Sequence, residues 1–448
     1  MAVALGCAEA PARAADIVVP EGADLQAAID GAAEGDTVVL RGKHRGPVTI
    51  ARRLTLRGEP GASIVGTGEG SVIKVTAPGA VVRGLAISGS GRNLEAMDAG
   101  VFVEQSATGA VVENNHIEGN LYGIYLHGAP NSLARGNTII GINVGPTNET
   151  GNGVSVWNAP GAKVVHNDFR FGRDGIFVIA SQGNVFTGNR FRDMRFAVHY
   201  MYTNDSKVSG NVSLGNVVGY AIMYSRELLV HGNVSDGDRN NGLLFNFVNR
   251  SEIVGNTVKG RLQPAERWKS VGQRGVDGHL PSLEKADAAI FAGARNAPEK
   301  CVFIYNTNQN VFRDNWFEGC EIGVHFTAGS ENNMIQNNAF VDNRNQVKYV
   351  GTRYLDWSEG GRGNYWSDNP AFDLDGDGVA DTAYRPNDVI DKVLWTAPQA
   401  KVLLNSPAVQ VIRWAQAQFP ALLPGGVVDS HPLMSPPERQ TAGIKGPS

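Results

Sequence analysis

Three residues near the middle of the chain carry side chains that suit a soft metal ion. His199 and Met201 are two residues apart, and Met223 follows in the next stretch of similar sequence. If this region is a β-strand, His199 and Met201 point to the same side of it. Imidazole and thioether groups are soft ligands that suit Cu(I) and select against Mg²⁺ and Ca²⁺. The three residues are therefore a candidate Cu(I) site.

The same three residues have a simpler interpretation. Two methionines and a histidine can fill a protein–protein interface without binding any metal ion. The sequence has only three cysteines and no paired C-x-x-C signature that would specify a metal site. Spacing alone leaves both interpretations open.

A second set of candidate ligands lies nearer the C-terminus. Asp373, Asp375 and Asp377 occupy positions 1, 3 and 5 of a segment with Gly at position 6 and Asp381 at position 9. This pattern matches the start of an EF-hand calcium loop. Position 12 is Tyr384 instead of a bidentate Glu, so the EF-hand is incomplete. The pattern predicts a structural Ca²⁺ at the four aspartates; the alternative is a solvated acidic turn.

The elements that must position these residues repeat with a short period. The marker is an Asn before a β-type apolar residue, at Asn115, Asn137, Asn167, Asn189, Asn211, Asn233 and Asn256. Five of the six spacings are 22 or 23 residues and the other is 30. Such a period indicates stacked units that share one core, and the alternation between markers is typical of strands. The dense leucine consensus of a leucine-rich repeat is missing, so we predict a right-handed parallel β-helix.

The repeat also predicts which side chains point outward. The predicted outward positions are Tyr125, His127, Ser155, Trp157, Phe177, Ile179, His199, Met201, Met223, Ser225, Leu244, Asn246, His325 and Thr327. Tyr224 is assigned to the core. Many outward positions are apolar or aromatic, which is typical of a binding surface. Met223 is expected about 5 Å from the His199 strand, on the next coil. The outward positions together form a stripe along the solenoid. His127 and His325 belong to this stripe but lie several coils away, too far to complete the site.

An exposed groove on a β-helix also suggests carbohydrate binding or polysaccharide modification. That chemistry needs paired carboxylates, or a carboxylate-bound cation with a base, on one face. Asp174, Asp193 and Asp205 are assigned to turns, and none aligns with another carboxylate along the stripe. Trp157 could still stack on a sugar ring, so this alternative stays open.

The N-terminal residues and the composition indicate where the protein works. Residues 1–15 resemble the remnant of a signal peptide, because Ala12-Arg13-Ala14 matches an A-x-A cleavage site; an unstructured tail is the alternative. The net charge is −4 with a pI of about 6.2, and no Lys/Arg stripe predicts a nucleic-acid partner. No apolar run approaches the roughly 18 residues of a membrane span.

The β-helix is predicted to occupy residues 16–350. A short helix capped by Asp24 would cover its first coil. The spacing from Asn256 to Asn315 is 59 residues, so residues 261–300 are predicted to be an inserted loop.

Two cysteines, Cys301 and Cys320, follow this insertion. Aligning Asn315 with Asn338 places Cys301 level with Val324, in an inward column, and Cys320 on another side of its coil. A disulfide is possible in an oxidising compartment, but this register does not favour it.

Residues 351–436 form a different C-terminal segment, with the Asp-rich loop followed by a helix and an extended arm. Ser406-Pro407 is a good helix start. Trp414 and Phe419 lie in the apolar surface of that helix, which could cover the end of the solenoid or dock onto a partner. Residues 437–448 are predicted to be disordered.

Several motifs resemble one known family. These are Gly363–Asp368 (GNYWSD), Phe372–Gly378 (FDLDGDG), Ala383–Asp388 (AYRPND), Gly323–Ser330 (GVHFTAGS) and Val347–Tyr354 (VKYVGTRY). They resemble the NosD family, the periplasmic β-helix maturation proteins of nitrous oxide reductase. The similarity extends over essentially the whole chain after residue 15.

The resemblance implies a non-enzymatic, periplasmic subunit of an ABC transporter complex, bound to a transmembrane permease that works with a cytoplasmic ATPase. It further implies a part in assembling the copper–sulfur centre of nitrous oxide reductase, by transient copper handover or by docking of the target. A copper chaperone would be another partner. The family supplies no ligand motif to carry over, so His199, Met201 and Met223 stay an inference from register. The family also favours the C-terminal helix and arm, with Trp414 and Phe419, for permease docking.

Overall fold

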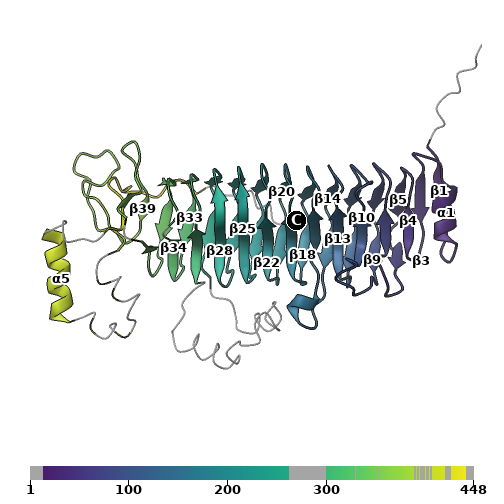
Figure 1. The fold of residues 1–448 in the computed structure, drawn as a ribbon, viewed down its shortest axis with the longest axis horizontal. Coiled ribbons are helices and arrows are strands. Elements are labelled where there is room, and N and C mark those ends of the chain that lie inside the picture. Colours follow the sequence, from purple (N-terminus) through teal and green to yellow (C-terminus); the bar gives the residue numbers. More distant parts are fainter. Residues whose placement is uncertain are drawn as a thin grey trace, which may run out of the picture.

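The computed structural model describes residues 14–261, 299–327, 329–351, 353–387, 406–418 and 425–439, with a few single residues between 388 and 405. This part of the chain winds into a right-handed parallel β-helix, as predicted, with three sheets running along its length. Figure 1 shows the strands stacked in rows between helix α1 (Leu25–Gly31) at one end and helix α5 (Pro407–Gln418) at the other. A short 3₁₀ helix, η1 (Thr147–Glu149), interrupts one turn.

Each sheet takes one strand from each successive coil. The first sheet contains β1 (Asp16–Val19), β2 (Thr37–Leu40), β5 (Thr55–Gly58), β8 (Val81–Arg83), β11 (Val111–Glu113), β14 (Leu133–Arg135), β17 (Lys163–Val165), β20 (Val185–Thr187), β23 (Lys207–Ser209), β26 (Leu229–His231), β29 (Glu252–Val254), β32 (Val311–Arg313) and β35 (Met334–Gln336). The second contains β4 (Val48–Ile50), β7 (Ile73–Val75), β10 (Ala99–Val103), β13 (Tyr122–His127), β16 (Val154–Trp157), β19 (Asp174–Ile179), β22 (Phe196–Met201), β25 (Val218–Arg226), β28 (Asn241–Asn249), β31 (Lys300–Tyr305), β34 (Ile322–Thr327) and β37 (Val347–Val350). The third contains β3 (Lys43–Arg45), β6 (Ser63–Val65), β9 (Ala86–Ser88), β12 (His116–Glu118), β15 (Thr138–Ile140), β18 (Asp168–Arg170), β21 (Arg190–Arg192), β24 (Val212–Leu214), β27 (Val234–Asp236), β30 (Thr257–Lys259), β33 (Trp316–Glu318), β36 (Ala339–Val341) and β39 (Tyr365–Trp366). A separate pair joins β38 (Leu355–Asp356) to β40 (Val427–Val428).

The marker asparagines form a continuous ladder at one buried corner. Its rungs are Asn115, Asn137, Asn167, Asn189, Asn211, Asn233, Asn256, Asn315, Asn338 and Asn364. Each Oδ1 accepts from the backbone N–H and the Nδ2 of the preceding rung, as at Asn211, which accepts both from Asn189 at 3.0 Å. The side chains thereby satisfy backbone groups that the turn would otherwise bury without partners. This bonding explains why the sequence repeats an asparagine.

The predicted inward and outward pattern holds with one local correction. Tyr224 was assigned to the core and Ser225 to the surface, but Tyr224 is 39% exposed and Ser225 is 3% exposed. In β25, Tyr220 pairs with Val198 and Met223 pairs with Met201, so the strand lies two residues out of the alignment used in the prediction. A shift of two keeps the same faces. The chain turns just after Met223, where Tyr224 adopts a positive φ of 49°.

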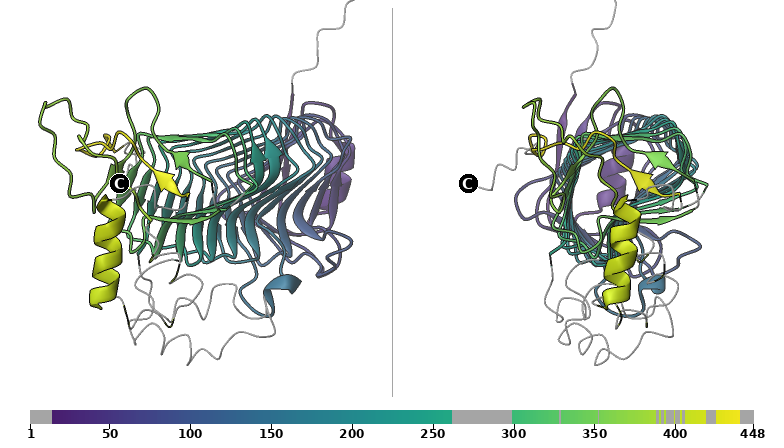
Figure 2. Two further views of the ribbon diagram at one scale, coloured as in Figure 1. Left: turned by 60° about the vertical axis from the view of Figure 1, so that its left-hand side comes forward. Right: turned by 90° about the vertical axis from the view of Figure 1, so that its left-hand side faces the viewer.

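Both ends of the solenoid are covered. Asp24 caps α1 by accepting from the Ala27 N–H at 3.0 Å, as predicted. At the far end, residues 425–434 return to the last coils, where the buried Asp429 accepts from Trp366 Nε1 at 2.8 Å. Figure 2 shows this returning segment across the end of the coils, next to α5. The described part of the predicted arm is thus built into the solenoid.

Cys301 and Cys320 form a disulfide, with Cα atoms 5.6 Å apart, which overturns the register argument against pairing. Lys300 pairs with Ile322, so Cys301 lies beside Gly323, one residue away from the predicted alignment with Val324. A Cβ built on Gly323 would lie 3.0 Å from Asn343 Nδ2, which shows that this position faces the turn between the third and second sheets, a different corner from that of the asparagine ladder.

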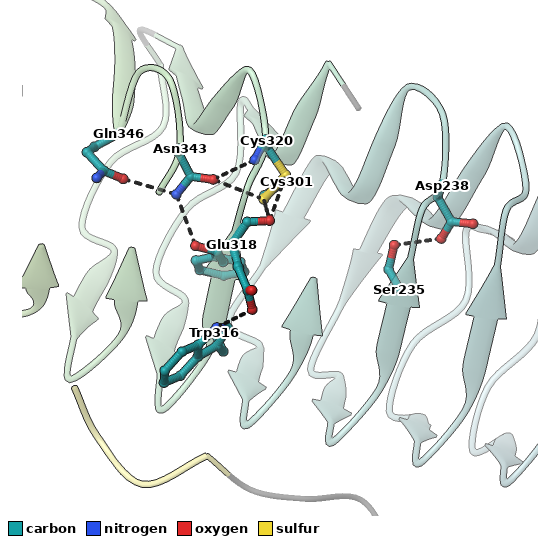
Figure 3. The surroundings of a disulfide bond; sticks show 9 residues. Ser235, Asp238, Cys301, Trp316, Glu318, Cys320, Asn343 and Gln346 are labelled. Atoms are coloured by element: carbon teal, nitrogen blue, oxygen red, sulfur yellow. Dashed lines mark hydrogen bonds between the residues drawn. A yellow bond between two sulfur atoms is a disulfide. The ribbon is translucent and has the colours of Figure 1, made fainter. Parts of the chain in front are cut away.

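That corner is also where Cys320 lies, because its N–H donates to Asn343 Oδ1 at 2.9 Å. Figure 3 shows the two sulfur atoms joined at this corner. The disulfide links β31, the first strand after the predicted insertion, to the turn that begins the next coil. Nearly all of that insertion (262–298) lies outside the described residues.

The remaining segment predictions fall partly outside this description. Of the predicted signal-peptide remnant, residues 1–13 are not covered. Within the predicted disordered tail, Arg439 is described and pairs with Glu318 at 2.5 Å. Among the described residues, no helix has the length and apolar character needed to cross a membrane.

Candidate metal site

The outward face of the second sheet carries two parallel columns of side chains. The His199 column consists of Phe102, Tyr125, Ser155, Phe177, His199, Ala221, Leu244, Phe303 and His325. The Met201 column consists of His127, Trp157, Ile179, Met201, Met223, Asn246 and Tyr305. Neighbouring members of a column come from successive coils, about 4.8 Å apart. Side chains far apart in sequence therefore meet here.

The structure brings the three predicted copper ligands together. His199 and Met201 lie on the same face of β22, and Met223 is the register partner of Met201 on β25. Both methionines are half-buried. In the next coil, the register partner of His199 is Ala221, which carries no further ligand group. The arrangement offers one imidazole and two thioethers, a ligand set suited to Cu(I).

Two charged residues hold the imidazole of His199. Its Nδ1 lies 3.0 Å from Asp174 Oδ2 and 3.3 Å from Arg195 NH2. Arg195 also binds Asp174 through two hydrogen bonds, at 2.8 Å from Nε and 2.5 Å from NH2. Among the described residues, no hydrogen-bond partner is found for His199 Nε2. Of the two ring nitrogens, only Nδ1 is therefore occupied by a hydrogen bond within the described part of the chain.

Burial makes this cluster electrostatically strong. The side chain of Asp174 is 1% exposed, and those of Arg195 and His199 are 15% and 12% exposed. Burial by itself raises the pKa of Asp174, but the hydrogen bonds from His199 and Arg195 and the charge of Arg195 outweigh it and lower that pKa below its usual value. Asp174 is therefore an ionised acceptor at neutral pH.

Aromatic rings restrict the imidazole further. The Phe177 ring lies 4.9 Å from the His199 ring, and the Phe196 ring meets it edge-on at 5.0 Å. The Arg195 guanidinium lies over Phe196 at 4.4 Å. His199 is consequently held by packing on two sides and by ionic hydrogen bonds on another.

The sequence analysis did not assign Asp174 and Arg195 to the site. Asp174 was placed in a turn, but it is the first residue of β19, and Arg195 precedes β22. One signal was available, because Arg195 lies 21 residues after Asp174, about one coil. An acid and a base one coil apart are expected to be neighbours in a β-helix.

The other two histidines of the stripe have different surroundings. His127 stacks on Trp157 with ring centroids 4.5 Å apart. His325 lies 5.1 Å from the Phe303 ring, and its Nδ1 is buried without a hydrogen-bond partner. Burial, and then the charges of Lys348 and Lys300, lower the pKa of His325 to about 4. Neither histidine has a methionine as register partner or an ionic hydrogen bond to its ring.

The two columns do not provide the carboxylate pair that carbohydrate cleavage requires. From β10 to β34, none of the register positions in either column is an Asp or Glu. The exposed rings also stack on one another: Tyr202 stacks on Tyr224 at 4.9 Å, and His127 stacks on one face of Trp157 at 4.5 Å. A sugar ring would need one of those faces free.

The Asp-rich loop brings three of its four predicted ligands together. Carboxylate oxygens of Asp373, Asp375 and Asp377 lie within 4.8 Å of one another. Asp373 accepts from the N–H groups of Gly376 at 2.6 Å and Gly378 at 2.9 Å, which lowers its pKa.

The fourth predicted ligand, Asp381, accepts from the Leu374 N–H at 2.7 Å. For Asp375, the hydrogen bond from the Asp377 N–H lowers the pKa, but the neighbouring carboxylates of Asp377 and Asp373 contribute to a net raised pKa. A cation would relieve this repulsion.

The predicted docking residues lie on and just after α5. The helix begins at Pro407, and the Val409 N–H donates to Ser406 Oγ at 3.4 Å, as a capping serine would allow. Trp414 is 63% exposed, and Val411 and Ile412 are exposed beside it. Phe419 lies outside the described residues.

This geometry defines the class of protein: a parallel β-helix with a line of soft ligands and aromatic rings on one sheet. Residues 136–371 match a family described as "Periplasmic copper-binding protein (NosD)". A relative from Stutzerimonas stutzeri, named "Probable ABC transporter binding protein NosD", is 41% identical over 396 residues, 88% of this chain and 86% of its own. A relative of the same name from Pseudomonas aeruginosa is 39% identical over 404 residues, 90% of this chain and 89% of its own. The chain belongs to the NosD family, which confirms the predicted resemblance.

The fold is shared more widely than the family. The solved structure of the Yersinia enterocolitica family 28 exopolygalacturonase matches with a TM-score of 0.53, over 75% of this chain and 77% of that one. The two sequences are 10% identical, so this likeness shows the fold alone.

Proposed function

We propose that this protein is a non-enzymatic periplasmic accessory protein that carries Cu(I) for assembly of the copper–sulfur centre of nitrous oxide reductase. The observation that carries the proposal is the cluster of His199 with Met201 and Met223, with the ring held by Asp174 and Nε2 left for a metal ion. Membership of a family described as periplasmic and copper-binding supports it. Copper is cargo here, bound transiently and passed on.

Soft ligands at a half-buried position suit this exchange. Thioether ligands bind Cu(I) in preference to Ca²⁺ or Mg²⁺ and carry no charge, so they do not trap the ion as thiolates would. The Met201 column faces outward, where a donor copper chaperone and the acceptor reductase could each reach it. Docking of the reductase without copper binding is the weaker form of the same proposal.

We place the transporter contact on α5. The relatives are named as ABC transporter binding proteins. The exposed Trp414, Val411 and Ile412 give α5 an apolar surface that suits contact with a transmembrane permease, which in turn works with a cytoplasmic ATPase. Phe419, the other residue predicted for docking, follows directly after α5 in the sequence. Replacement of Trp414 by Ala is expected to weaken copurification with the permease while copper binding is retained.

We further propose that Asp373, Asp375 and Asp377, with Asp381, hold a structural Ca²⁺ in the C-terminal segment. The three carboxylates that lie within 4.8 Å of one another support this assignment. Addition of Ca²⁺ to chelator-treated protein should raise its melting temperature, and replacement of Asp375 by Asn should abolish that rise. An equal melting temperature with and without Ca²⁺ would contradict the assignment.

The copper function is tested in cells that lack the gene and are complemented with variants. Nitrous oxide reductase purified from cells with His199→Ala should lack the copper–sulfur centre, as judged by its visible spectrum and copper content. His325→Ala is the matched control, because it removes a histidine from the same column. A normal centre in the His199→Ala strain would contradict the copper-carrier form of the proposal.

A further inference from the structure

We propose that Asp174 and Arg195 are positioning residues that fix the protonation of His199. In this arrangement the proton stays on Nδ1, and the lone pair of Nε2 is presented to the metal ion. The inference rests on the proposed function for the identity of that ion, Cu(I). The tautomer itself is a property of the metal-free protein.

The contacts of Nδ1 favour this tautomer over the other one. An ionised carboxylate only accepts hydrogen bonds, and a guanidinium only donates them. Asp174 Oδ2 at 3.0 Å is nearer to Nδ1 than Arg195 NH2 at 3.3 Å. The same NH2 group already donates to Asp174 Oδ2 at 2.5 Å. A protonated Nδ1 therefore gains a charge-assisted bond, whereas a bare Nδ1 would place its lone pair against a buried carboxylate.

Arg195 has a separate part in this arrangement. With 1% of its side chain exposed, Asp174 would be costly to bury as a lone charge, and the two hydrogen bonds from Arg195 offset that cost. They also orient the carboxylate, so that Oδ2 faces the imidazole. Asp174 controls the tautomer of His199, and Arg195 controls the direction of the Asp174 carboxylate.

A second consequence follows for metal binding. A carboxylate that accepts from one imidazole nitrogen raises the basicity of the other and fixes the ring plane. His199 is held by two aromatic rings as well, so the ligand atom is already in place before Cu(I) arrives. Loss of such an outer partner typically costs about 10- to 100-fold in metal affinity.

The first test is a nitrogen NMR measurement on wild-type protein with ¹⁵N-labelled histidine, without metal, at neutral pH. The His199 side chain should show a protonated Nδ1 and an unprotonated Nε2, assigned by comparison with His199→Ala. A ring protonated on Nε2 alone would overturn the proposal. This measurement needs no substitution that could disturb the fold.

The second test replaces Asp174 by Asn, a change of nearly equal shape. An amide nitrogen and Arg195 would then both donate towards Nδ1, so the proton should move to Nε2 and Cu(I) affinity should fall about 10- to 100-fold. The matched control is Asp168→Asn, which removes an acid that pairs with Arg192 at 3.3 Å on the third sheet. That variant should keep the wild-type tautomer and affinity.

The outcomes separate this inference from the proposed function. An unchanged tautomer or unchanged Cu(I) affinity in the folded Asp174→Asn protein would refute the positioning role. If wild-type protein binds no Cu(I) at all, the proposed function fails, while the NMR result still decides the tautomer. Melting temperatures of all variants identify any loss of affinity that is only loss of structure.

Discussion

Along the buried corner of the solenoid, the coils from Asn115 to Asn364 contribute the same residue to one ladder. Along the outward columns of the second sheet, neighbouring coils contribute different residues, from Trp157 to Met201 to Tyr305. The corner must satisfy identical backbone groups in each coil, so its chemistry repeats. The columns face solvent, so their residues are free to differ. Repetition marks what holds the coils together, and variation marks where a specific site can arise.

The largest expected effect on stability comes from breaking the ladder. Replacing Asn211 by Ala removes the acceptor of the Asn189 N–H and the donor to the Phe186 carbonyl, both buried. Leaving such groups unpaired should lower the free energy of unfolding by about 3–5 kcal/mol. Urea unfolding measures this, with Asn148→Ala as an exposed control. An equal midpoint for the two variants would contradict the role of the ladder.

Removal of the disulfide should have the next largest effect. The bond closes a loop with a sequence separation of 19. Replacing both Cys301 and Cys320 by Ala should lower the free energy of unfolding by about 3 kcal/mol. Alanine should fit at position 301, because the strand register places Ala197 at the equivalent position of an earlier coil. Cu(I) affinity should not change, since Cys301 lies in β31, two coils beyond β25, and a large loss of affinity would argue against two independent regions.

A smaller effect is expected at the second corner, between the third and second sheets, where one coil departs from the local pattern. Asp238 accepts from the Asn216 N–H at 2.7 Å in a position that an asparagine occupies in other coils. Burial raises its pKa to about 6. Between about pH 4 and pH 6, the folded state thus holds a proton that the unfolded state has lost. The contribution of Asp238 to the free energy of unfolding therefore falls as the pH rises through this range.

Asp238→Asn should therefore stabilise the protein by about 2 kcal/mol above pH 6 and make no difference near pH 4. Thermal unfolding of both proteins across this range gives the measurement. A variant that is less stable than wild type at pH 7.5 would show that the carboxylate is needed at the corner.

The smallest effects are expected at the other histidines of the stripe. His127→Ala and His325→Ala should leave Cu(I) affinity within about twofold of wild type, because neither ring has soft ligands beside it. Competition titration compares them directly with His199→Ala. A tenfold loss in either variant would mean that the metal site extends beyond the coils of β22 and β25.

The sequence predicts the parts of this structure that repeat. The asparagine spacing and the alternation of apolar residues were enough for the β-helix and for the placement of Met223 on the outward face of the coil next to His199 and Met201. A shift of two residues in β25 left the faces unchanged, so the prediction for Met223 survived an alignment error. The error appeared only at the turn, where Tyr224 is exposed.

The parts that depend on a single residue were harder to predict. The true register differs by one residue from the predicted one. It places Cys301 at the turn between the third and second sheets instead of in an inward column, so the disulfide was not predicted. Asp174 and Arg195 belong to no repeat, and their contact with His199 depends on side-chain direction at the start of a strand. Periodicity predicts which coils are neighbours, but the contacts at a coil's edge need coordinates.

The central claim is that the His199, Met201 and Met223 cluster binds Cu(I). The most direct measurement is a Cu(I) titration of purified wild-type protein against a competing chelator, alongside His199→Ala and Met223→Ala. We predict one Cu(I) bound per wild-type chain, with affinity reduced at least about 100-fold in both variants. Absence of Cu(I) binding by the wild-type protein, or unchanged affinity in both variants, would contradict the claim.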